Sequence, residues 1–120
     1  MIDSHAAPMN DICVTISKDF TRFPGGRYKK HGARSGEEFR EDILLPALRA
    51  GARVRVILDG TVGYPASFLE EAFGGLVRRG FSSEELSDLL VIDAISTDFH
   101  AYKKKAEQYI KEAESSKTGT

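Results

Sequence analysis

The sequence contains one cysteine, no tryptophan and no long hydrophobic run, and each of these features excludes a class of protein. The single cysteine, Cys13, cannot form an internal disulfide, which is typical of a protein in a reducing compartment such as the cytoplasm. No apolar run approaches the roughly 20 residues that a membrane-spanning helix needs. The formal net charge of -1 gives no electrostatic reason to expect nucleic acid or a membrane surface as a partner.

Motifs for metals, cofactors and catalysis are also missing. The histidines His5, His31 and His100 have no metal-ligand spacing, and one cysteine cannot build a zinc site. The glycine pairs at 25–26 and 74–75 fall in neither a Walker nor a dinucleotide-binding pattern. No serine–histidine–aspartate arrangement can be argued from the sequence. We therefore expect no cofactor, no metal and no catalytic residue.

The composition is that of an ordinary soluble domain. The chain has 120 residues, of which 41% are hydrophobic and 29% charged, and this suits one domain with a single core. Residues 1–9 lack the apolar stretch of a signal peptide, and we interpret them as a disordered leader with Met9 as an alternative start. We expect one folded domain over residues 10–114 and a frayed tail over 115–120.

Hydrophobic periodicity predicts strands that alternate with helices. Apolar residues alternate over 12–16, and the apolar runs 54–58 and 89–92 have the length of strands. The run 54–58 alternates and then becomes continuous, as expected for a strand covered on both faces. We interpret residues 28–32 as a short edge strand or a loop. Helical periodicity begins at residues 35 and 67 and recurs over 98–112, so we expect an α/β fold: a single-layer mixed sheet of three to five strands with helices packed on it.

Local signals predict where the helices begin and end. Capping boxes of the form Ser-x-x-Glu begin at Ser35, Ser67 and Ser82, where the serine would accept a hydrogen bond from an early backbone N–H. Pro46 lies inside the first helical stretch, so we expect it to kink or end that helix. The glycine pair at 74–75 weakens the second helix, and a close approach of that helix to the sheet would explain it.

The segment 59–68 joins the central predicted strand to a helix start, where α/β proteins tend to bind ligands and partners. It begins with Asp59-Gly60 and ends with Ser67-Phe68. Phosphorylation of Ser67 would add about -1.5 to -2 charges at a helix start, which favours negative charge, whereas an acidic partner surface would repel it. The alternative is that Ser67 only caps the helix, which contributes roughly 1 kcal/mol.

Two stretches of the chain, SFLEEAFGGL at residues 67–76 and GARSGEEFR at residues 32–40, resemble the signatures of the STAS-like domain family of unknown function. Residues 67–76 read SFLEEAFGGL, similar to a signature in which Ser-Phe precedes two acidic residues and Phe-Gly. Residues 32–40 read GARSGEEFR, similar to a second signature with Gly, Ser/Thr-Gly and Phe/Ile-Arg. Glu70 stands where many relatives have Asp. Together with the strand ending at Asp59, the resemblance covers most of residues 10–100.

The resemblance implies a fold like that of the anti-sigma factor antagonists, which bind a histidine-kinase-like ATPase. In those domains a Ser or Thr at this helix start is the phosphorylation site, and Ser67 is its counterpart by position. The usual Asp-Ser-Ser/Thr-Gly around that residue is absent here, because Ala66 and Phe68 flank Ser67. The resemblance therefore supports a histidine-kinase-like ATPase as the partner more directly than it supports phosphorylation of Ser67.

Other residues of the two signatures have a functional and a structural interpretation. Phe68 is either an exposed anchor for a partner or buried against the sheet. Glu70 serves the cap, and Glu71 is either exposed or paired with an arginine. Arg34 and Arg40 could bind an anion or a carboxylate on a partner, although such arginines more often form ion pairs within the protein.

The expected function is a non-enzymatic regulatory module that binds a protein partner through the loop and helix start around Ser67. Asp59, Gly60, Glu70 and Glu71 are the accompanying contact candidates. The alternative is a small-ligand sensor or an enzyme of unknown type that uses Asp59 and Arg34. A deep pocket would favour the ligand, whereas a flat surface with exposed apolar residues would favour a protein partner. A homodimer is compatible with either.

Overall fold

The computed structural model describes residues 11–118, which fold around a three-stranded parallel sheet. The strands are β1 (Asp11–Thr15), β2 (Arg53–Ile57) and β3 (Leu90–Asp93), and they lie side by side in that order. Both neighbouring pairs are parallel. The α/β class and the strand positions are confirmed, but the sheet is parallel in these residues rather than mixed.

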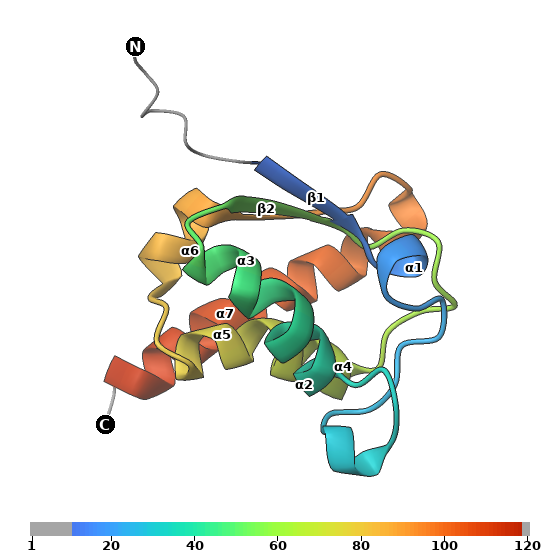
Figure 1. The fold of residues 1–120 in the computed structure, drawn as a ribbon, viewed down its shortest axis with the longest axis horizontal. Helices are drawn as coiled ribbons and strands as arrows, with labels where there is room; N and C mark the ends of the chain where they lie inside the picture. The colour runs from blue at the N-terminus through green and yellow to red at the C-terminus, as the bar shows by residue number, and fades with distance from the viewer. Residues whose placement is uncertain (1–10, 119–120) are drawn as a thin grey trace.

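Helices pack against one face of this sheet, as Figure 1 shows with the sheet above and the helices below. Two long helical segments are each interrupted by a π-helical turn. The helical elements are α1 (Ile16–Asp19), a 3₁₀ turn (Lys29–His31), α2 (Gly36–Phe39), a π turn (Arg40–Leu44), α3 (Leu45–Arg49), α4 (Ala66–Leu69), a π turn (Glu70–Gly74), α5 (Gly75–Arg78), α6 (Ser83–Leu89), a 3₁₀ turn (Thr97–Phe99) and α7 (His100–Thr118).

The opposite face of the sheet is open to solvent. Along β2, Val54 and Val56 are buried under the helices, whereas Arg53 and Arg55 are exposed. The expectation that this strand is covered on both faces is therefore wrong, since only alternate residues are buried. Cys13 is likewise exposed rather than part of the core.

The first helical segment continues through Pro46 instead of ending there. A proline has no N–H and its ring clashes with the carbonyl four residues earlier, which here belongs to Asp42. The π turn Arg40–Leu44 lies directly before α3, which carries Pro46 in its first turn. A π turn widens the backbone by one residue, so the widened turn accommodates the proline where an α turn would not.

Several predicted boundaries change. Residues 29–31 form a 3₁₀ turn, so no edge strand is present at 28–32. Helix α7 extends to Thr118, so the predicted frayed tail is wrong for 115–118. The predicted leader 1–9 and the last two residues, 119–120, lie outside the described residues. One hydrophobic core joins residues from Val14 to Ala113.

Candidate functional site

The loops that follow the three strands meet at the carboxyl end of the sheet. Asp59 follows β2, and its carboxylate accepts hydrogen bonds from the backbone N–H groups of Ile95 and Ser96, both at 2.8 Å. These two residues follow β3, so Asp59 joins the second loop, which follows β2, to the third loop, which follows β3. Gly60 has a positive φ of 96°, and a Cβ there would lie 2.5 Å from the Ser17 hydroxyl. Glycine therefore lets the second loop pass close to α1.

Three exposed apolar side chains lie on these loops, one on each. Phe23, Val62 and Ile95 are 64%, 69% and 70% exposed, and they follow β1, β2 and β3 respectively. The backbone N–H of Val62 donates to the carbonyl of Arg22 at 2.9 Å, which joins the first loop to the second. All three loops lie at the same end of the sheet in Figure 1. We call Phe23, Val62 and Ile95 the loop surface.

Phe68 does not belong to this surface. It is fully buried, with its ring centroid 5.6 Å from that of Tyr64 and 6.2 Å from that of Phe39. The hypothesis of an exposed anchor is therefore wrong for Phe68, because the helix turns this ring into the core. Tyr64 fixes the preceding loop, since its hydroxyl donates to the carbonyl of Leu58 at 2.6 Å, and burial raises the pKa of Tyr64.

Ser67 does not cap its helix. The helix begins at Ala66, and Pro65 occupies the cap position, with its carbonyl accepting from the N–H of Phe68 at 3.0 Å. Within residues 11–118 the half-buried Ser67 hydroxyl makes no hydrogen bond. The Glu70 carboxylate pairs with Arg27 and Arg78 instead of reaching back to the helix start. The predicted box at Ser67 is therefore wrong. The box at Ser82 is confirmed with both of its hydrogen bonds.

The serine cap at Ser35 is confirmed, because its hydroxyl accepts from the N–H of Glu38 at 3.0 Å. The glutamate reaches one residue further than a capping box requires and accepts from the N–H of Arg34 at 2.7 Å. Arg34 has a positive φ of 60°, and its guanidinium lies over the Phe20 ring at 5.5 Å. Its side chain is 54% exposed and pairs with Glu38 at 3.2 Å. Arg34 therefore stays accessible at the surface.

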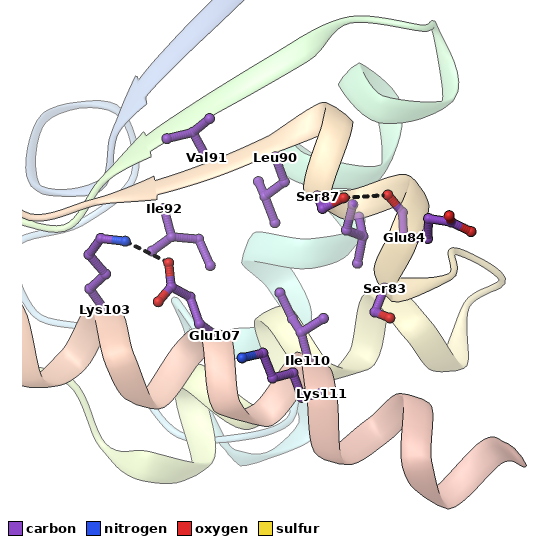
Figure 2. Close-up of a pocket in the computed structure, with 11 residues that line it drawn as sticks. Ser83, Glu84, Ser87, Leu90, Val91, Ile92, Lys103, Glu107, Ile110 and Lys111 are labelled. Atoms are coloured by element: carbon purple, nitrogen blue, oxygen red, sulfur yellow. Dashed lines mark hydrogen bonds and ion pairs between the residues drawn. The ribbon is translucent and has the colours of Figure 1, made fainter.

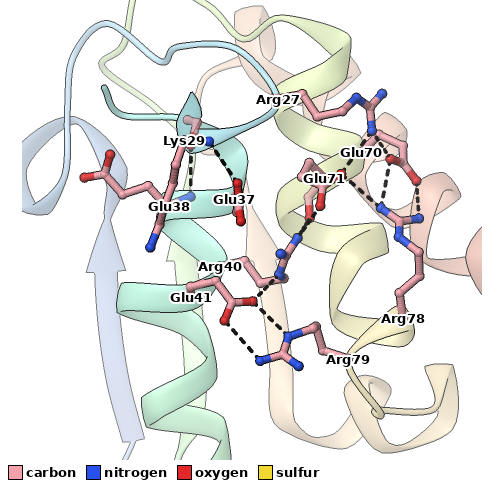
Figure 3. Close-up of polar contacts among 11 residues, drawn as sticks. Arg27, Lys29, Glu37, Glu38, Arg40, Glu41, Glu70, Glu71, Arg78 and Arg79 are labelled. Atoms are coloured by element: carbon pink, nitrogen blue, oxygen red, sulfur yellow. Dashed lines mark hydrogen bonds and ion pairs between the residues drawn. The ribbon is translucent and has the colours of Figure 1, made fainter. Parts of the chain in front are cut away.

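Glu70 and Glu71 belong to an ion-pair network that Figure 3 shows between the two interrupted helices. Glu70 pairs with Arg27 at 2.5 Å and with Arg78 at 2.7 Å. Partial burial raises the pKa of Glu70, but hydrogen bonds from Arg78 and Arg27 outweigh it, so the pKa lies below its ordinary value. Arg27 comes from the loop after β1, so this pair ties that loop to the second helical segment.

Arg40 and Glu71 form the buried centre of the network. Arg40 is 6% exposed and donates from Nη1 to the Glu71 carboxylate at 2.6 Å and to the Glu71 carbonyl at 2.7 Å. In the π turn the N–H of Gly75 bonds to the carbonyl of Glu70, five residues back, which leaves the Glu71 carbonyl for Arg40. Arg40 is therefore an internal residue, and its predicted contact with a partner is wrong.

The glycine pair at 74–75 makes room for this network. A Cβ on Gly75 would overlap the guanidinium of Arg40, and a Cβ on Gly74 would lie 2.8 Å from the Glu70 carboxylate. The expected close approach of the helix to the sheet is therefore wrong, because the nearby atoms belong to charged side chains and, at 3.3 Å from a Cβ on Gly74, to the Tyr109 carbonyl of α7. Glu41 completes the network with Arg40 at 2.8 Å and Arg79 at 3.0 Å. The Arg79 hydrogen bond in particular lowers the pKa of Glu41 to about 2.

Three pockets lie on other parts of the described surface. The largest of them, about 640 Å³, lies between β3, α6 and α7 and is drawn in Figure 2. The other two, of about 500 and 390 Å³, lie beside α5 and around Tyr28. None of the three is lined by Asp59, Arg34 or Ser67. No hydrogen bond or ion pair joins Asp59 to Arg34 in residues 11–118, so the structure does not bring these two candidates together.

Sequence reasoning missed the loop surface, although a signal was present. Phe23, Val62 and Ile95 are single large apolar residues beside glycine, proline or serine, on the segments that follow the predicted strands. Such positions are loops, where a large apolar residue has no core to enter. Among residues 11–118, no group of three His, Cys, Asp or Glu side chains could hold a metal ion. In the same residues, no helix has the length and apolarity needed to cross a membrane.

The structure is a small α/β domain, in which helices cover one face of a parallel sheet. A buried arginine–glutamate network joins two of its helical segments. The family model of the STAS-like domain of unknown function (DUF4325) matches residues 35–98, more than half of the chain, and the chain belongs to this family. The match includes all of residues 67–76 and residues 35–40 of the second stretch, so the resemblance is confirmed. No curated protein and no solved structure matches the chain.

Proposed function

We propose that this domain is a non-enzymatic regulatory module that binds a protein partner through the loop surface. The observation that carries the proposal is the exposure of Phe23, Val62 and Ile95, each on the loop that follows a different strand. Exposed apolar side chains gathered at one end of a domain are typical of a protein-binding surface. The carboxyl end of a parallel sheet is also where α/β domains tend to bind partners.

The hydrogen bonds between the loops support a protein partner. Asp59 holds the third loop, and the contact from Val62 to Arg22 holds the first. A surface fixed before binding loses little conformational entropy when a partner docks, so more of the contact energy appears as affinity. The alternative ligand site at Asp59 and Arg34 has less support, because both Asp59 oxygens already accept hydrogen bonds within the chain.

The partner class rests on the family resemblance. We propose a histidine-kinase-like ATPase or a related signalling protein, in the cytoplasm. Phosphorylation of Ser67 is the regulation that the resemblance suggests, and its hydroxyl is half-buried with no hydrogen bond inside residues 11–118. A phosphate there would add about -1.5 to -2 charges in the first turn of the helix that follows the second loop.

The test is affinity capture from the native cell lysate, read by mass spectrometry, with the wild type and single serine variants. Phe23→Ser, Val62→Ser and Ile95→Ser should each reduce capture of the ATPase about fivefold or more, as expected for apolar anchors. Ile12→Ser is the matched control, because Ile12 is 37% exposed but lies on β1, outside the loop surface. Each variant should keep the unfolding midpoint of the wild type, since surface changes rarely shift stability.

The outcomes separate the parts of the proposal. Equal capture of the partner by all three loop variants would refute the loop surface as the binding site. If the variant Ser67→Glu still captures the partner, phosphorylation of Ser67 is refuted as the regulation, while the proposed interaction stands. If no ATPase or signalling protein is enriched by the wild type, the partner class is wrong.

A further inference from the structure

Strand β3 forms an open edge of the sheet in the described residues. It pairs with β2 alone, and the Leu58 N–H donates to the Asp93 carbonyl at 3.0 Å. Backbone groups of successive strand residues point to opposite sides, so those of Ile92 point away from β2. No other described residue bonds to the N–H or the carbonyl of Ile92. The edge therefore presents one free donor and one free acceptor, with the Leu90 carbonyl beside them.

Strand β3 has no lysine, proline or bulge of the kind that protects many edge strands, and its inward-facing residues Leu90 and Ile92 are 7% and 4% exposed. Natural edges carry lysine, proline or a bulge, or are covered by a helix or a loop. The sequence of β3 is Leu-Val-Ile-Asp, and Val91 is 53% exposed. Its one charge, on Asp93, is paired with Arg55. An unprotected apolar edge is a template for another strand.

A groove runs along this same edge. The pocket of about 640 Å³ is lined by Leu90 and Ile92, which face the helices, and by Val91, which faces the other side of the sheet. Residues from both faces of one strand can line a single pocket only where it follows the edge of that strand. Leu86 of α6 and Ile110 of α7 add apolar surface below the edge, as Figure 2 shows for the α7 side.

Some of the charged side chains around the groove have an ion-pair partner and others have none. On α7, Lys103 pairs with Glu107 at 2.5 Å, whereas Lys111, about two turns after Lys103 on the same row, has no ion pair in residues 11–118. Both Lys103 and Lys111 line the groove (Figure 2). A segment lying in the groove therefore meets one unneutralised positive charge on the α7 side and, on the α6 side, the carboxylate of Glu84, which also has no ion pair in residues 11–118.

We propose that the β3 edge binds an extended segment of a partner polypeptide as a fourth strand. Its backbone would pair with Ile92, its alternate apolar side chains would pack on Leu86 and Ile110, and an acidic side chain would meet Lys111. The free donor and acceptor on a strand edge select an extended backbone, which a helix or a compact molecule cannot match. This site is separate from the loop surface and does not depend on the function proposed there.

The test uses a capped eight-residue peptide of alternating valine and serine with one glutamate as the probe, titrated into the ¹⁵N-labelled chain. Hydrogen exchange of the Ile92 amide should be fast in the free protein and slow at least tenfold with the peptide. Amide shifts should be confined to β3, α6 and α7. The same peptide with N-methyl groups along its pairing edge should leave these amides unchanged.

Two charge reversals on α7 provide the matched comparison. Lys111→Glu should weaken peptide binding about two- to fivefold, and 0.5 M salt should remove that difference. Lys104→Glu has the same charge change but lies outside the groove lining, so its affinity should equal that of the wild type. Both lysines are exposed, so neither change should affect folding.

Three results would overturn the proposal. The first is a lack of any response of the Ile92 amide to the peptide. The second is an equal response to the N-methylated peptide, because backbone pairing would then not be involved. The third is an Ile92 amide already protected in the free protein, in proportion to protein concentration and with a dimer seen by sedimentation. In that case a second copy of this chain covers the edge.

Discussion

The change Gly75→Ala tests the buried network, because two effects of known size oppose each other there. Alanine inside a helix is about 1 kcal/mol more favourable than glycine, so most such changes stabilise a protein. At this position the new methyl group would overlap the guanidinium of Arg40 and force it away from Glu71. Breaking a buried ion pair by displacing one partner costs roughly 3–5 kcal/mol. The expected net loss is therefore about 2–4 kcal/mol.

The lower part of that range is more realistic for this chain. Glu71 keeps weaker contacts with Arg27 at 3.2 Å and Arg78 at 3.4 Å, which partly offset the loss of Arg40. The free energy of unfolding is measured by urea denaturation followed by circular dichroism. The same change is then made in the double variant Arg40→Ala/Glu71→Ala, which holds neither charge.

In that background the methyl group meets no guanidinium, so Gly75→Ala should become stabilising by up to about 1 kcal/mol. The reversal of sign isolates the contact with Arg40 from any general intolerance of alanine. If Gly75→Ala is neutral or stabilising in the wild type, the guanidinium moves aside without cost, and the reasoning about the network is refuted.

Three further predictions concern single groups. The pKa of Glu41, about 2, lies below its ordinary value of 4.5. The ionised Glu41 carboxylate therefore stabilises the fold fully above pH 4.5, and this stabilisation is lost as the pH falls towards 2. Glu41→Gln should flatten the acid limb of a curve of unfolding free energy against pH. Ser67→Ala should change the free energy of unfolding by less than about 0.5 kcal/mol, whereas Ser82→Ala, which removes a real cap, should cost about 1 kcal/mol in the same urea titration. Tyr64→Phe should cost about 1–2 kcal/mol, because the buried carbonyl of Leu58 loses its hydrogen bond, and a melting temperature equal to that of the wild type would contradict this.

The strands and most helix positions were predictable because they depend on local periodicity. Alternation around Val54 and Val56 predicted β2, and the apolar run to Ile92 predicted β3. The number of covered faces was not predictable from β2, since Ile57 and Leu58 extend the apolar run at the point where the strand ends. The π turns were also missed, because a sequence pattern of 3.6 residues does not reveal one widened turn before Pro46.

The candidate site was only partly predictable, because most of its chemistry depends on long-range pairing. The sequence pointed to Asp59 and to the segment after it, but not to its hydrogen bond with Ile95, which follows β3 and lies 36 residues further along the chain. Arg40 and Glu71 were both noticed as charges, yet their mutual burial follows only from the packing of two helical segments. The pairing of Glu71 with an arginine was one of two alternatives, and the structure selects it.

The parallel arrangement of the strands has a consequence for how the chain folds. Arg53 and Asp11, opposite one another on β2 and β1, are 42 residues apart, and Arg55 is 38 residues from Asp93. No strand can pair until a loop of that length has closed, which is a slow step compared with helix formation. The helices should therefore form first, and the sheet, which depends on non-local contacts, should form more slowly. During that interval the apolar strand Leu90–Asp93 is exposed on both sides, so crowding of nascent chains should lower the yield of folded protein.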